Sequence, residues 1–163
     1  MGQTLLVMGA MILLSIAVLS ANRIILDRMN SGYETQAIFD AVPIAEGKLD
    51  EIRRKAFDEK SLNKRIYVAS NFTQPAYLGK DAGETTTVTY DDIDDYNNDS
   101  LRFSTPVLEN FWVVSKIQYV SETNPDQVSS TPTFFKLITV KVYHYSMKIP
   151  ITMTFLYVYR RFE

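Results

Sequence analysis

The chain has 163 residues, of which 46% are hydrophobic, 22% charged and 12% aromatic, and this composition predicts one modest folded domain rather than a disordered chain or a repeat array. The 17 basic and 19 acidic residues give a net charge of −2, so the chain lacks the basic field that holds nucleic acid. It has no cysteine and a single histidine, which excludes disulfides, cysteine nucleophiles and multi-histidine metal centres. We therefore expect neither a nucleic-acid partner nor an enzyme, and no catalytic residue is assigned.

Residues 1–22 contain no charged side chain. A run of about 20 apolar residues is long enough to cross a bilayer as a helix. Three interpretations are open: a cleaved signal peptide, a membrane anchor, or a helix that packs in an assembly. No basic residue precedes Leu5, which disfavours a signal peptide. Arg23 and Arg28 follow the run, and basic residues on that side disfavour a simple anchor with an external domain.

Residues 23–60 continue the helix with an amphipathic pattern. Because Pro43 lacks a backbone N–H, we expect the helix to bend or break near residues 39–43. A helix over residues 4–57 would be roughly 80 Å long, too long for a small globular core to bury. Apolar residues recur here at intervals of three to five, which predicts one buried stripe: Ile25, Met29, Tyr33, Ile38, Val42, Ala45, Leu49, Ile52 and Ala56.

Residues 61–163 read as a β-rich globular domain. Two short segments, 65–69 and 86–90, are weak strand candidates. Three longer segments rich in Val, Ile, Thr, Phe and Tyr are stronger ones: Asn110–Val120, Thr133–Tyr145 and Pro150–Phe162. We therefore predict an α+β fold in which a long N-terminal helix, apolar in its first half and amphipathic in its second, packs on an antiparallel β-meander.

An acidic stretch follows residue 90. Its hard oxygen ligands suit Ca²⁺, but an EF-hand loop counted from its first aspartate would place Tyr96 at the glycine position and Arg102 at the glutamate position, which excludes that module. We favour a solvated turn in which the side chains cap backbone amides. Calcium is the alternative, no other cofactor is expected, and the candidate ligands are Asp91, Asp92, Asp94, Asp95 and Asp99.

His144 lies between Tyr143 and Tyr145 in an apolar segment. No second histidine and no cysteine is present to share a metal or a proton relay with it. We therefore expect a packed or edge histidine rather than a catalytic one.

The segment Gly2-Gln3-Thr4-Leu5-Leu6-Val7, followed by an apolar helix and a β-rich domain, resembles the type IV pilin-like superfamily of major pilins, minor pilins and secretion pseudopilins. The family's processing region has a glycine, the first mature residue, Thr-Leu-aliphatic and then a glutamate. Val7 stands at the glutamate position if Gly2 precedes the cut, and Leu5 stands there if Met1 is the first mature residue. Residues 91–97, DDIDDYN, are similar to acidic stretches in the soluble domains of some members.

The resemblance implies a structural subunit of a helical extracellular filament, assembled through N-terminal helices. Its partners would be copies of itself, with a precursor pool in the inner membrane before assembly, and its location the cell surface. Cell adhesion is one role that such filaments have. The alternative is a single-pass membrane-anchored binding module or a secretion pseudopilin. The expected assembly core consists of Leu5, Leu6, Met8, Met11, Ile12, Leu13, Leu14, Ile16, Val18 and Leu19.

Overall fold

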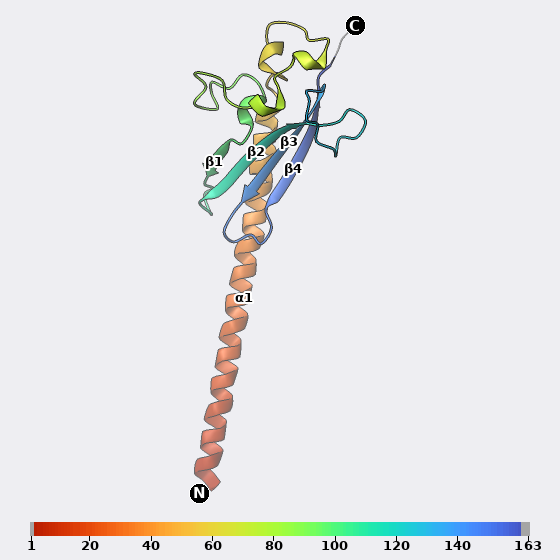
Figure 1. Cartoon of the computed structure of the whole chain (residues 1–163). Helices are drawn as coiled ribbons and strands as arrows, with labels where there is room; N and C mark the ends of the chain where they lie inside the picture. Colours follow the sequence, from red (N-terminus) through yellow and green to blue (C-terminus); the bar gives the residue numbers. More distant parts are fainter. Residues whose placement is uncertain (1, 161–163) are drawn as a thin grey trace.

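The computed structural model describes residues 2–160 and begins with one helix, α1 (Gly2–Ile52), of 51 residues. At 1.5 Å per residue this helix is about 77 Å long. Figure 1 shows its N-terminal part projecting as a bare rod from a globular part built on its C-terminal end. Every described residue up to Tyr33 is exposed. The long helix and the α+β layout agree with the sequence prediction.

The expected local break at Pro43 is wrong, because α1 continues through this proline to Ile52. The backbone carbonyl that loses its hydrogen bond belongs to Phe39, four residues earlier. Phe39 lies on the exposed side of the helix, where water can hydrate that carbonyl. The helix ends before the predicted residue 57 because the backbone of Ala56 pairs instead with the segment at residues 91–93.

The sheet covers only the C-terminal part of α1. The buried face of the helix repeats every three or four residues and is mostly alanine, which allows close approach of the strands: Ala37, Ala41, Ala45, Lys48 and Ile52. The predicted stripe is right at Ala45 and Ile52. It is wrong at Ile25, Met29, Tyr33 and Ile38, which are exposed. The loop at residues 145–148 reaches the helix beside Tyr33, where Lys148 Nζ lies 2.9 Å from Glu34 Oε2, but it does not bury these side chains.

Four antiparallel strands form the sheet in the order β1-β2-β3-β4. They are β1 (Ser100–Phe103), β2 (Phe111–Tyr119), β3 (Phe135–Tyr143) and β4 (Ile151–Val158). The three longer strands confirm the predicted segments within one or two residues at the described ends. The predicted end of the last segment, Phe162, lies outside the described residues, and β4 ends at Val158. The sequence analysis missed β1, which is short and mostly exposed.

A long connection, residues 53–99, joins α1 to the sheet and contains four short 3-10 helices: η1 (Glu59–Ser61), η2 (Ala69–Asn71), η3 (Pro75–Tyr77) and η4 (Asp94–Tyr96). The strands predicted at 65–69 and 86–90 are wrong. The Ile66 N–H donates to the Tyr159 hydroxyl rather than to a strand, and Thr89 N–H closes a turn onto the Thr86 carbonyl. Neither segment has a neighbouring strand to satisfy its backbone, so β-propensity alone does not produce a ladder.

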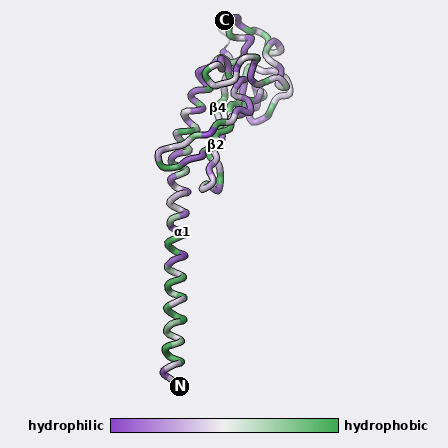
Figure 2. Tube along the Cα trace, turned by 90° about the vertical axis from the view of Figure 1, so that its left-hand side faces the viewer, coloured by the Kyte–Doolittle hydropathy of each residue, from purple (hydrophilic) through white to green (hydrophobic). Residues whose placement is uncertain are grey.

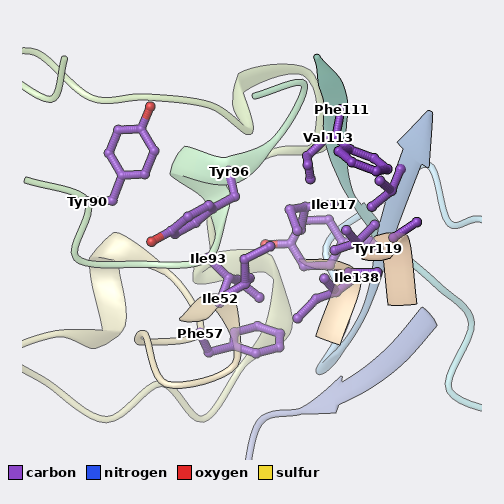
Figure 3. Packing of buried hydrophobic residues seen from close by; sticks show 14 of the residues in the cluster. Ile52, Phe57, Tyr90, Ile93, Tyr96, Phe111, Val113, Ile117, Tyr119 and Ile138 are labelled. Atoms are coloured by element: carbon purple, nitrogen blue, oxygen red, sulfur yellow. The ribbon is translucent and has the colours of Figure 1, made fainter. Parts of the chain in front are cut away.

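The core lies between α1, the inner face of the sheet and the 53–99 connection. Residues on β2 and β3 alternate between buried and less buried positions along the strands, as expected for a sheet with one covered face. Figure 3 shows side chains from all three parts meeting in this core: Ile52, Phe57, Ile93, Ile117, Tyr119 and Ile138.

Candidate functional site

The ten predicted assembly residues all lie on the projecting half of α1. Each is at least half exposed, from 52% for Val18 to 74% for Leu6. They occupy ten of the fifteen positions from 5 to 19, and because successive residues turn by about 100°, they surround the helix instead of forming one stripe. A helix that is apolar all round is stable only when another apolar medium or surface covers it. Figure 2 shows this hydrophobic section of the trace.

Exposed apolar side chains continue beyond the predicted set. They reach the point where the sheet begins to cover the helix: Ile24, Ile25, Leu26, Met29, Tyr33, Ile38 and Phe39. By length and composition α1 is able to cross a membrane. The exposed apolar surface from Leu5 to Phe39 is nevertheless roughly 50 Å long, whereas the hydrocarbon core of a bilayer is about 30 Å thick. A bilayer alone therefore leaves part of this surface uncovered.

The five predicted calcium ligands lie in different environments. Asp92, Asp94, Asp95 and Asp99 are buried and Asp91 is exposed, so the solvated-turn interpretation is wrong about solvent. It is right about capping, because Asp92 Oδ1 accepts from the Asp94 N–H at 2.6 Å and the Asp95 N–H at 3.3 Å. The turn is buried because η4 packs beneath the sheet, which the local sequence does not reveal.

Asp94 and Asp99 have lysine partners instead of a shared ion position. Lys136 Nζ lies 2.7 Å from Asp94 Oδ1, and Lys80 Nζ lies 2.8 Å from Asp99 Oδ1. Asp91 and Asp95 instead lie together with a further acid, because ligand oxygens of Glu84, Asp91 and Asp95 lie within 4.8 Å of one another. The sequence analysis missed Glu84, which lies outside the acidic stretch.

Burial is the main cause that raises the pKa of Asp95 to about 8, and the side-chain hydrogen bond with Glu84 raises it further. At neutral pH the pair therefore shares a proton. A shared proton relieves the repulsion between the two carboxyl groups.

A buried lysine forms the centre of the globular part. Lys136 is completely buried on β3, and its Nζ donates to the Phe57 carbonyl at 2.7 Å, to Asp58 Oδ2 at 3.2 Å and to both oxygens of Asp94 at 2.7 and 2.8 Å. The rings of Phe57 and Tyr119 lie 4.5 and 4.8 Å from Nζ. One amine thus meets two carboxyl groups in an aromatic pocket that is closed to solvent.

The two carboxyl groups around Lys136 differ in their environment. Asp58 accepts additional hydrogen bonds from Lys60 N–H, from the N–H and hydroxyl of Thr73, and from the Tyr119 hydroxyl. Asp94 receives hydrogen bonds on its side chain from Lys136 alone among residues 2–160. Burial raises the pKa of Asp94 to about 7 despite the lysine. The neutral form of Asp94 is therefore accessible near neutral pH.

His144 is packed, as predicted. Ser146 N–H donates to its Nδ1 at 3.2 Å, so Nδ1 is the acceptor and Nε2 carries the proton that the Glu109 carbonyl accepts at 3.1 Å. The imidazole stacks on Phe111 with a centroid separation of 4.5 Å. Both ring nitrogens are thus used in structural contacts.

No family model, curated protein or solved structure matches this chain. Functional inference therefore rests on two features of the molecule itself. One is the uncovered apolar surface of α1, and the other is the sealed pocket around Lys136.

Proposed function

We propose that this chain is the structural subunit of a helical extracellular filament of the type IV pilus-like kind, assembled through its N-terminal helices. The observation that carries this proposal is the apolar surface from Leu5 to Phe39, which is exposed in the single chain and longer than a bilayer is thick. The pilin-like arrangement of a long helix and an antiparallel sheet supports the same assignment. No cofactor or catalytic residue is part of it.

Apolar burial supplies the driving force for assembly. Burying one Leu or Ile side chain stabilises by roughly 1.5–3 kcal/mol, so the ten assembly residues contribute on the order of 20 kcal/mol before the cost of ordering the subunits. A second copy of the chain offers a matching apolar helix of the same length. Gly9, Ala10, Ser15 and Ala17 lie among the larger side chains and permit close approach of helix backbones.

Repetition of one head-to-tail contact between copies builds an open helical polymer, because the contact does not close on itself. Arg23, Asp27 and Arg28 lie between the two apolar sections of α1. In such a polymer the aspartate of one copy pairs with an arginine of a neighbour, which fixes the stagger between helices. Globular parts then form the outer shell, at the cell surface, where adhesion is a role open to them.

Before assembly, the uncharged residues 2–22 hold the subunit in the membrane, since α1 is long and apolar enough to span it. The alternative function is therefore a single-pass membrane-anchored binding module, or a pseudopilin of a secretion apparatus. The extension of the exposed apolar surface beyond residue 22 favours the filament.

The test is polymerisation of purified protein after removal of detergent, followed by sedimentation and negative-stain microscopy. Wild-type protein is expected to form filaments, and Leu13→Lys is expected to abolish them, because a charge in an apolar helical core costs about 3 kcal/mol per subunit. Val107→Lys is the matched control, since Val107 is 67% exposed on the globular part and Leu13 is 69% exposed on α1. Filaments formed equally by Leu13→Lys would contradict the proposal, and a wild-type protein that stays monomeric in lipid would favour the anchored module.

A further inference from the structure

The pocket around Lys136 contains the parts of a condensation reaction. Lys136 Nζ is almost equidistant from the two oxygens of Asp94, at 2.7 and 2.8 Å, so it lies close to the carboxyl carbon between them. Reacting atoms held about 3–3.5 Å apart gain a large effective concentration. We propose that Lys136 and Asp94 join in an intramolecular amide bond that ties β3 to η4.

Burial favours this reaction. The side chains of Lys136 and Asp94 are 0% and 4% exposed, and the rings of Phe57 and Tyr119 lie against the amine. A charged ammonium–carboxylate pair is costly when it is buried among aromatic rings. This cost favours transfer of a proton from the Lys136 ammonium group to the Asp94 carboxylate. The resulting neutral amine and neutral acid are the reactive forms, and the absence of bulk water opposes hydrolysis of the product.

Asp58 is placed to move the proton. It lies 3.2 Å from Lys136 Nζ, and the hydrogen bonds from Thr73 and Tyr119 stabilise its carboxylate form. Asp58 therefore acts as the base while Asp94 is the group attacked. The different hydrogen bonding of the two acids is what assigns these roles.

The proposed step balances without a further reactant. The neutral Nζ of Lys136 attacks Cγ of Asp94, and Asp58 accepts a proton from the nitrogen as the N–C bond forms. Asp58 then delivers this proton to the departing hydroxyl group. The C–O bond breaks, one water molecule leaves, and Asp58 returns to its carboxylate form.

The bond would fasten the 53–99 connection to a central strand. Asp94 and Lys136 are 42 positions apart in the chain, and η4 otherwise belongs to a connection without strands. A covalent tie at this point keeps the connection folded on the sheet when the globular part is pulled. The inference does not depend on the proposed filament, since it concerns one chain.

The test is a tryptic peptide map of the folded, full-length wild-type protein. Trypsin does not cleave at an acylated lysine, so the amide is expected to give residues 117–141 joined to residues 81–102, lighter than the sum of the two by one water molecule. Fragmentation should locate the branch at Lys136 and Asp94. Separate peptides 81–102 and 117–136 would overturn the proposal. Residues 56–60 joined to 117–141 would place the bond on Asp58 and overturn the assignment of Asp94.

The chain supplies its own control in the Lys80–Asp99 pair. Its Nζ–Oδ1 distance of 2.8 Å is similar, but the Lys80 side chain is 39% exposed. Normal cleavage after Lys80 is expected, and an amide at that pair as well would overturn burial as the cause.

Two variants test the roles of the residues. Lys136→Arg should give only separate peptides. Asp58→Asn should slow amide formation by about 100-fold or more, as loss of a general base does, whereas an unchanged rate would overturn the role given to Asp58.

Discussion

The two halves of α1 have the same backbone and opposite surroundings. The half up to Tyr33 is mostly apolar and wholly exposed, whereas the half from Ala37 onward buries three alanines, and also Lys48, whose ammonium group lies over the Tyr96 ring. In the projecting half the apolar side chains are exposed, and in the globular part charged groups are buried with partners. The hydrophobicity of a segment thus shows that its surface must be covered, but whether the same chain covers it depends on where the other elements of the fold lie.

Truncation should separate the two halves most strongly. A chain of residues 58–163 lacks α1 and uncovers the inner face of the sheet, so it is expected to be unfolded or aggregated at 25 °C. A chain that begins at Ala21 keeps the buried face of the helix and should fold as a monomer. Circular dichroism melting and size-exclusion chromatography measure both properties. Equal melting temperatures for the two chains would show that α1 does not stabilise the sheet.

The buried charges should be far more important for stability than the exposed ones. Asp58→Ala removes the acceptor of the Tyr119 and Thr73 hydrogen bonds and leaves Lys136 with one carboxyl group, so a loss of about 3–5 kcal/mol is expected. Asp50→Ala, which breaks the 3.1 Å pair with the half-exposed Arg53, should cost about 0–1 kcal/mol. Urea denaturation measures the two values. Similar losses would mean that the network around Lys136 contributes no special stability.

The pH dependence of stability should come from the globular half. Burial raises the pKa of Asp92 to about 7 and that of Asp95 to about 8, above the value of about 4 in an unfolded chain. Between about pH 4 and pH 8 the folded state therefore binds more protons than the unfolded state, so the free energy of unfolding falls as pH rises through this range. We expect the melting temperature to be about 3 °C or more lower at pH 8 than at pH 5.

Asp95→Asn should flatten this dependence because it removes the group with the higher pKa, and Asp126→Asn, at an exposed position, should leave it unchanged. A melting temperature that rises from pH 5 to pH 8 in the wild type would contradict the shifted pKa values.

Calcium should have the smallest effect. With Asp95 and Glu84 sharing a proton, the cluster with Asp91 does not present its full negative charge at neutral pH. Adding CaCl₂ or EDTA at pH 7 is therefore expected to change the melting temperature by less than about 1 °C. A functional site at one hundred times its Kd would instead stabilise the chain by about 2.7 kcal/mol, and a calcium-dependent rise of several degrees would revive the calcium alternative.

Local periodicity explains which elements were predictable. Three strands and the long helix have strong patterns of their own, while β1 is only four residues long and exposed. The burial of the acidic stretch depends on a partner in β3, 42 positions from Asp94, which no local pattern contains. One signal was present: Lys136 falls in register with Ile138, Val140 and Val142, so a lysine occupies the apolar face of a strand. A lysine on the apolar face of a strand needs buried acidic partners, and the acidic stretch contains one of them, Asp94.

Electron cryo-microscopy of the purified wild-type protein after detergent removal would show directly whether the N-terminal helices hold the subunits together. We expect helical filaments in which the projecting halves of α1 form a continuous central bundle, with residues 5–39 in contact with neighbouring copies and the sheets on the outside. Filaments whose contacts lie between sheets, with the projecting helices free in solvent, would contradict it.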